Sequence, residues 1–180
     1  MTDRLIEELK ARVVSGKRLT MLGVADMPKP FQPATKTEIA HAEQRLGVHF
    51  PTIFRRVYGE VGNGGFGPGY GMIGLITGHQ DEGSIISHYE FDTGVLWENW
   101  RWPHGRVRLA HWGCSIWSCV DLTTEAAPVL RFDPNGFIES SEDTRDEGLE
   151  PSESLEQFFV AEKDGFGDWL SDWLNGTLKF

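Results

Sequence analysis

TKTEIAHAEQRLGVHFPTIFRRVYGEVGNGGF, residues 35–66, contains the signals for two short helices and a glycine turn. Thr35 and Glu38 have the spacing of a capping box, in which each side chain bonds to the backbone amide of the other residue. Apolar residues then recur on one helical face as far as Leu46. Gly47 follows, at the position where a left-handed residue commonly ends a helix. The pattern therefore predicts a first helix that begins after Thr35 and ends at Leu46.

A second helix is predicted to begin at Pro51, because the fixed φ of proline suits the first helical position. Its apolar stripe consists of Ile53, Phe54, Val57, Tyr58 and Val61. The turn that ends this helix requires positive φ angles, and Asn63, Gly64 and Gly65 are the residues expected to supply them.

The same turn places Gly62, Gly64 and Gly67 in the G-x-G-x-x-G register of dinucleotide-binding loops. Such a loop needs a strand before it and a helix after it, so that helix N-terminal amides face the phosphates. Here a helical pattern precedes the glycines. Residues 68–71, Pro-Gly-Tyr-Gly, cannot begin a stable helix. The motif therefore predicts a helix end and a turn, not a cofactor site.

Several short motifs are found together along the chain. They are Glu38-Ile39-Ala40, Leu46-Gly47, Phe50-Pro51, Tyr58, Asn63-Gly64-Gly65, GCSIWSCVD at 113–121, Ala127-Pro128-Val129 and Ser154-Leu155-Glu156-Gln157-Phe158-Phe159. In combination they resemble the SUKH superfamily, which includes the yeast Smi/Knr cell-wall regulators, over residues 35–175. In that family the last motif is a C-terminal helix. The tryptophan-rich stretch 97–102 and the acidic stretch 139–150 match no pattern of the family.

The resemblance implies an α+β fold with a central antiparallel sheet, helices packed around it and no catalytic centre. In bacteria it implies a common role as an immunity protein that binds and neutralises a cognate secreted toxin, whereas other members regulate by protein contact. Partner surfaces differ within such a family, so the resemblance identifies a scaffold and assigns no binding residue.

Length and charge are consistent with one domain over residues 1–180, made of an N-terminal helix and loop (1–34) and the region of resemblance (35–175). The first residues predict an amphipathic helix whose buried side holds Leu5, Ile6 and Leu9. They lack an apolar secretion core, and no run reaches the roughly 18 apolar residues of a membrane span. We therefore expect a cytoplasmic protein that binds no membrane.

Three further segments have patterns that predict their structure. Residues 107–133 alternate short apolar runs with turn residues, which predicts a meander of antiparallel strands. Cys114 and Cys119 fall on opposite faces of such a strand, which favours small buried thiols and makes a disulfide between them unlikely. The spacing of apolar residues from Leu155 to Leu174 predicts one helix or two broken ones, ended by Asn175-Gly176. Prolines in residues 16–34 predict a loop.

No catalytic or metal site is supported by the sequence. His41-Ala42-Glu43 has the H-x-E form of a zinc deaminase but lacks the P-C-x-x-C partner, so His41 is expected to be a solvated helix residue. The serines lie in no G-x-S-x-G elbow; they include Ser84, Ser87, Ser115 and Ser118. The densest group of potential ligands fits no recognised spacing and is interpreted as a polar loop; it consists of His79, Asp81, Glu82 and His88. No cofactor is expected.

Two stretches are candidates for binding a partner. The first is acidic, in a chain of net charge −10, and its candidate residues are Glu139, Glu142, Asp143, Asp146 and Glu147. Such a surface repels nucleic acid, attracts a basic protein and can mimic the phosphates held in a toxin's groove. The alternative is a solvated acidic loop, which is at least as common.

The second stretch is WENWRW, whose candidate residues are Trp97, Trp100 and Trp102. Tryptophan and arginine dominate the energetic hot spots of interfaces. The alternative is that these indoles pack into the core, which is the more frequent use of large aromatics.

The sequence therefore predicts a non-catalytic, single-domain SUKH-type protein that acts by binding another protein. The favoured partner is a toxin with a basic surface, a nuclease for example. The alternative is a regulatory or scaffold module of the Smi/Knr type without a toxin partner.

Overall fold

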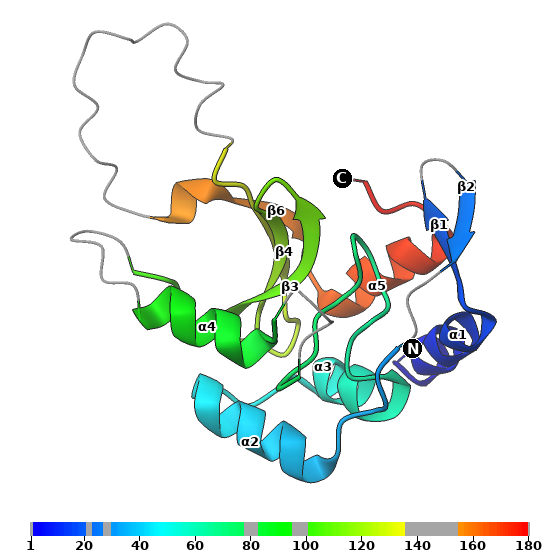
Figure 1. The fold of residues 1–180 in the computed structure, drawn as a ribbon, viewed down its shortest axis with the longest axis horizontal. Coiled ribbons are helices and arrows are strands. Elements are labelled where there is room, and N and C mark those ends of the chain that lie inside the picture. The colour runs from blue at the N-terminus through cyan, green and yellow to red at the C-terminus, as the bar shows by residue number, and fades with distance from the viewer. Residues whose placement is uncertain are drawn as a thin grey trace, which may run out of the picture.

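The computed structural model describes residues 2–20, 23–26, 30–77, 83–94, 101–135 and 155–179. These residues form the predicted α+β fold, in which helices surround an antiparallel sheet (Figure 1). The helices are α1 (Thr2–Ser15), α2 (Lys36–Leu46), α3 (Thr52–Arg56), the π-helical turn η1 (Val57–Val61), α4 (Ile85–Gly94), the 3-10 turn η3 (Leu155–Phe158) and α5 (Phe166–Asn175). The strands are β1 (Lys17–Thr20), β2 (Gly23–Asp26), β3 (Arg106–Gly113), β4 (Ile116–Asp121), β5 (Val129–Phe132) and β6 (Phe159–Lys163).

The main sheet has the order β3-β4-β5-β6, and every neighbouring pair is antiparallel. The order of β3, β4 and β5 confirms the meander predicted over residues 107–133, whereas β6 lies in a segment that was predicted to be helical. Adjacent residues of β4 show how the sheet is covered, because side chains alternate between faces along a strand. Trp117 contacts His88 of α4, whereas Ser118 bonds to Glu162, which also binds Trp169 of α5. Helices α4 and α5 therefore lie on opposite faces of the sheet (Figure 1).

Helix α2 begins and ends as predicted. The Thr35 hydroxyl accepts the Glu38 amide at 3.2 Å, and the Thr35 amide donates to the Glu38 carboxylate at 2.7 Å. Gly47 closes the helix with φ 69°. The next helix, α3, begins at Thr52, one residue later than predicted, and Pro51 is its cap. Its apolar stripe continues into η1, where Val57, Tyr58 and Val61 are buried.

The glycine turn, residues 62–75, follows η1 and packs against its own backbone. Gly64 and Gly65 have φ angles of 84° and 82°, as predicted. Asn63 was wrongly predicted to share this conformation. It is buried, and its side-chain oxygen accepts the Leu75 amide at 2.8 Å. Its polar side chain therefore joins the two ends of the turn.

The core between the helices and the sheet is rich in aromatic residues. Phe54 lies 5.0 Å from Phe50, 4.7 Å from Tyr58 and 5.3 Å from Phe166, measured between ring centroids. The Tyr58 hydroxyl donates to the Ile73 carbonyl at 2.8 Å, and complete burial raises the Tyr58 pKa. Residues Leu5, Ile6 and Leu9 of α1 are buried as predicted. Within the described ranges, no helix combines the length and apolar character needed to cross a membrane.

Three predictions from local patterns were wrong. Part of residues 16–34, expected to be a loop, forms the antiparallel hairpin β1–β2. Residues 155–163, expected to be helical, form η3 and then the strand β6, because Phe159 and its successors pair with β5. Cys114, expected to be a buried strand residue, is exposed in the β3–β4 turn with φ 50°. Cys119 is buried as expected, and both thiols are free.

Candidate functional site

A layer of cationic and aromatic side chains covers the face of the main sheet on which α4 lies. We call it the arginine–aromatic face, and it consists of Trp102, Arg106, Arg108, Trp117, Phe132 and Phe159. Its residues come from β3, β4, β5 and β6 and from the segment before β3. The strand pairing brings them together: Trp117 lies opposite Phe132, and Phe132 lies opposite Phe159.

Arg108 is the centre of this face. Its guanidinium donates two hydrogen bonds to Asp92 of α4, at 2.7 and 2.8 Å. The two side chains are only 17% and 5% exposed, so the pair is largely removed from water. A bidentate arginine–carboxylate pair is the geometry that best offsets the cost of burying two charges. This pair therefore fixes α4 on the sheet.

The same guanidinium lies beside three rings. Its central carbon is 5.2 Å from the Trp102 ring centroid, 5.4 Å from Trp117 and 5.5 Å from Phe132. A cation within about 6 Å of an aromatic ring centroid is attracted by the ring's quadrupole. The arginine is thus held both by its carboxylate and by the rings around it.

Arg106 is the second cation of this face. It lies 4.4 Å from the Phe159 ring centroid and bonds to the Glu156 carboxylate at 3.0 Å. A second carboxylate, Asp121, is 3.7 Å away. The Arg106 side chain is 10% exposed, whereas Glu156 is 60% exposed. The charges of this face therefore reach the solvent at Glu156.

Trp102 is the one candidate tryptophan within the described residues. It is half-buried, with ring centroids 5.3 Å from Phe132 and 5.4 Å from Phe159. Its indole N–H donates to the Arg106 carbonyl at 2.6 Å. These contacts match the core-packing alternative for this indole. Trp97 and Trp100 lie outside the described residues.

The acidic candidates also lie outside the described residues; they are Glu139, Glu142, Asp143, Asp146 and Glu147. The described residues nearest to them in the chain are Asn135 and Leu155. Phe132 precedes this segment, and Glu156 and Phe159 follow it. All three belong to or contact the arginine–aromatic face, so the acidic stretch is joined to the described structure beside that face. The tryptophan-rich stretch is joined there as well, because it includes Trp102.

The opposite face of the sheet holds a partly buried carboxylate, that of Glu162, among neutral donors. One Glu162 oxygen accepts the Ser118 hydroxyl at 2.8 Å and the Trp169 indole N–H at 3.1 Å. The Trp112 indole N–H donates in turn to Ser118 at 2.8 Å. Burial raises the pKa of Glu162, while these hydrogen bonds and nearby Arg131 act in the opposite direction. This chain of bonds ties α5 to the sheet.

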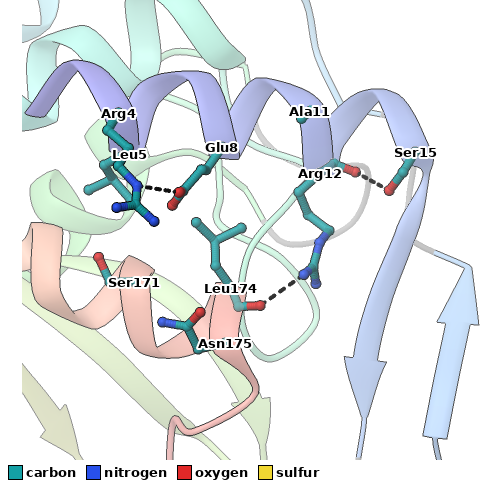
Figure 2. A pocket seen from close by; sticks show the side chains of 9 residues that line it. All are labelled: Arg4, Leu5, Glu8, Ala11, Arg12, Ser15, Ser171, Leu174 and Asn175. Carbon is teal, nitrogen blue, oxygen red and sulfur yellow. Dashed lines mark hydrogen bonds and ion pairs between the residues drawn. The ribbon is translucent and has the colours of Figure 1, made fainter.

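A groove of about 610 Å³ lies between α1 and α5 (Figure 2). Its charged side chains are engaged within the protein. Arg4 pairs with Glu8 at 2.7 Å, and Arg12 donates to the Leu174 carbonyl at 2.8 Å. That carbonyl belongs to the last turn of α5, whose C=O groups lack helical partners. The groove is thus the seam where α1 caps α5.

The residues considered for catalysis have structural surroundings. His41 is exposed on α2, as predicted. The Ser84 and Ser87 hydroxyls lie 3.1 Å apart and each accepts the other's backbone amide, which caps the start of α4. Burial raises the pKa of the Cys119 thiol, which makes a thiolate unfavourable.

The potential metal ligands do not form a site in the described part of the chain. His88 lies against Trp117, with ring centroids 4.9 Å apart. His79, Asp81 and Glu82 lie outside the described residues. Among the residues that are described, no group of three or more histidine, cysteine or acidic side chains is placed to hold a metal ion.

The fold, its capped α2 and its glycine turn define a small α+β domain of the SUKH type. The family model of the SMI1 / KNR4 family (SUKH-1) matches residues 33–161, and the chain belongs to that family. The match runs from just before α2 into β6, so it includes the whole arginine–aromatic face. A search of curated proteins gives no match for this chain.

The sequence predicted the fold better than it predicted the residues of the arginine–aromatic face. Arg106 and Arg108 carry no motif, and their partners stand 50 and 16 positions away in the chain. The one available signal was the alternation of arginine with apolar residues in RVRLAHW, residues 106–112. That alternation predicts that arginines share one face of a strand, but it does not identify the acids that meet them.

Proposed function

We propose that this protein is a non-catalytic immunity protein that binds and neutralises a cognate toxin of a bacterial polymorphic toxin system, inside the cell that produces the toxin. The observation that carries the proposal is the membership of the SMI1 / KNR4 family (SUKH-1) over residues 33–161. Proteins of this family are in general non-catalytic and of the immunity type. The mechanism would be occlusion of the toxin, not a chemical reaction.

The chemistry of the described residues supports a binding role. The charged groups of the arginine–aromatic face are paired with one another: Arg108 with Asp92, and Arg106 with Glu156 and Asp121. Groups that are held in this way order the sheet and its helices. A rigid scaffold of this kind suits recognition, because little order has to be gained on binding.

The two candidate stretches are proposed to contact the toxin. Residues 97–102 supply tryptophan and arginine, and residues 139–147 supply carboxylates. A chain of net charge −10 favours a partner with a basic surface and accelerates its association at low salt. A nuclease has such a surface, since its groove must hold phosphates. The acidic stretch would occupy or flank that groove.

The first experiment is co-expression with the protein encoded immediately upstream. If that protein is the toxin, its expression alone kills the cells, co-expression of this chain rescues them, and a pull-down recovers both proteins. A harmless neighbour that forms no complex would reject the proposal and favour a regulatory or scaffold module of the Smi/Knr type.

The acidic stretch is tested by charge reversal in the same complex. Glu142→Lys combined with Glu147→Lys is expected to weaken toxin binding at least tenfold and to flatten its salt dependence, because like charges then meet across the interface. The matched control is Glu7→Lys combined with Glu8→Lys, which changes the net charge equally on exposed positions of α1. Equal affinities for the two double variants would remove the acidic stretch from the interface.

A further inference from the structure

The two edge strands of the main sheet, β3 and β6, differ in whether another segment of the chain pairs with their outer side. The edge at β3 is covered by the glycine turn, since the Ile73 amide donates to the Leu109 carbonyl and the Tyr70 amide to the His111 carbonyl, both at 2.9 Å. Met72 also pairs with Ala110 as an isolated bridge. The other edge is β6. Among the described residues, no strand pairs with its outer side.

The register of β6 shows which of its backbone groups point outward. Phe132 lies opposite Phe159, and the Asp133 amide donates to the Phe158 carbonyl at 3.0 Å. Antiparallel partners alternate between bonded and non-bonded pairs, so Val160 is the residue that exchanges bonds with β5. The C=O group of Phe159 and the N–H and C=O groups of Ala161 therefore point away from the sheet. The Phe159 N–H also lies on this side, but it closes the last 3-10 turn of η3.

This edge also presents apolar surface. Val160 is 50% exposed, and Ala161 is exposed. Proteins usually guard an open edge with a free lysine, a proline or a bulge. The register shift between the pairs Leu130–Ala161 and Val129–Lys163 makes Glu162 an extra residue of β6, so the regular part of this edge is Phe159 to Ala161. Lys163 is the cation of β6, but its ammonium group bonds to Asp172 of α5 at 2.6 Å. The lysine is therefore directed to the helix.

The charge around β6 identifies the kind of segment that fits it. Residues 155–172 contain five carboxylates and one lysine. Three of these carboxylates are exposed, those of Glu156, Asp164 and Asp168, and they bracket the strand. A second copy of this chain would place like charges together along the joined edges, which is destabilising. An extended segment rich in lysine or arginine would instead meet opposite charges at both ends of the strand.

We propose that β6 binds an extended, basic segment of a partner protein, which adds to the sheet as a fifth strand next to β6. The outward groups of Phe159 and Ala161 would supply the main-chain hydrogen bonds, Val160 an apolar contact, and the bracketing carboxylates the charge preference. Strand addition is a recurrent mode of peptide recognition. The identification of this partner with a toxin rests on the function proposed above.

Amide hydrogen exchange of the free protein tests whether the edge is open. The amide of Ala161 is expected to exchange at least a hundredfold faster than that of Val160, which is bonded to β5. Slow exchange at both positions would show that another part of the chain already covers the edge, and it would overturn the proposal.

A peptide probe tests the edge without any toxin. The probe is a synthetic decapeptide of alternating lysine and valine, and its binding is followed by fluorescence anisotropy. Wild-type protein is expected to bind it and to gain protection at Ala161, whereas a backbone N-methylated version binds at least tenfold more weakly. Failure to bind, or binding without that protection, would overturn the proposal. So would self-association of the free protein through the same amide.

Two variants locate the binding on β6. Ala161→Pro removes one outward N–H, at the kind of edge position where proline is tolerated, and is expected to weaken binding about tenfold. Its unfolding midpoint reports whether the sheet survives. Val160→Lys places a cation beside the basic segment and keeps the backbone, so it serves if the proline variant unfolds. Val14→Lys is its matched control, since Val14 is 87% exposed on α1.

The outcomes for this edge and for the proposed function can be separated. If wild-type protein rescues cells from the upstream toxin and Ala161→Pro and Val160→Lys rescue equally well, β6 is not the site but the immunity role stands. If no rescue occurs and the decapeptide still binds through β6, the immunity role fails and the strand-adding edge stands.

Discussion

The glycine turn and the arginine–aromatic face are both buried, yet they are held by different means. In the turn, backbone meets backbone: the Gly65 amide donates to the Met72 carbonyl at 2.8 Å, and Phe31 donates to the Gly64 carbonyl at 3.2 Å. On the face, charged side chains meet across the sheet, as Arg108 and Asp92 do. At Gly64 the turn has no room for an added atom, whereas on the face Arg108 and Asp92 depend on each other as partners.

Addition of one methyl group tests the turn and gives the largest expected effect. A Cβ on Gly64 would lie 2.7 Å from three backbone atoms of residues 72–74, and its φ of +84° strains any side chain. Backbone atoms cannot move aside as a flexible side chain can. We expect Gly64→Ala to lower the free energy of unfolding by more than about 4 kcal/mol, measured by urea denaturation.

The control for this substitution separates crowding from backbone strain. Gly16 has a similar φ of +65°, but an added Cβ would meet nothing within 4 Å. Gly16→Ala is therefore expected to cost only the left-handed conformation, roughly 1 kcal/mol. If both substitutions cost the same, close backbone packing is not what holds the turn.

Removal of one partner tests the face. Arg108→Ala leaves the carboxylate of Asp92 buried without its bidentate partner and removes a cation from three rings. Loss of one member of a buried ion pair typically costs about 3–5 kcal/mol, and we expect a loss in that range from urea denaturation. The double variant Arg108→Leu with Asp92→Leu is expected to recover most of it, since neither charge is then left alone.

Arg56 provides the matched control on the surface. It bonds to Glu60 at 2.7 Å and to Asp3 at 2.5 Å, but these pairs are exposed to solvent and salt. Exposed ion pairs contribute little to stability. Arg56→Ala should therefore lower the unfolding midpoint much less than Arg108→Ala does. Equal losses of stability would mean that burial does not increase the contribution of the pair of Arg108 and Asp92.

The same contrast explains which parts of the fold could be predicted. The capping box of α2, the stop at Gly47 and the positive φ at Gly64 each depend on a few residues close together in sequence. Such local requirements leave a pattern. The order of β3, β4 and β5 was predicted because short loops join these neighbouring strands.

Features that depend on distant partners were missed. β6 carries the apolar spacing of a helix, but pairing with β5 makes it a strand, which is a tertiary effect. The pair of Arg108 and Asp92 joins β3 to α4, and no spacing rule predicts it. Of the predicted site residues, Trp102 is within the described structure, and its contacts with Phe132 and Phe159 could not be read from the sequence.

Glu162 can be compared with Asp92, because it is a partly buried carboxylate whose hydrogen-bond donors are neutral and not an arginine. Burial raises its pKa above the ordinary glutamate value of 4.5. In the pH range between the ordinary and the raised value, the folded protein binds more protons than the unfolded chain, so this group lowers stability as pH rises through that range. Glu162→Gln can keep both hydrogen bonds through its amide oxygen. We expect its unfolding midpoint to rise relative to wild type between about pH 4.5 and neutrality, measured by thermal denaturation.

Glu38 offers a control of opposite sign. Hydrogen bonds from the Thr35 amide and hydroxyl lower its pKa, so its contribution to stability is present above the ordinary glutamate value and is lost as pH falls through the lowered one. Glu38→Gln should therefore lose stability relative to wild type as pH rises, where Glu162→Gln gains it. The contrary result is that the Glu162→Gln and wild-type unfolding midpoints run parallel from pH 4 to 8. The hydrogen bonds of Ser118 and Trp169 would then fully offset the effect of burial on the Glu162 pKa, so that a carboxylate in this sheet could be stabilised without an arginine partner.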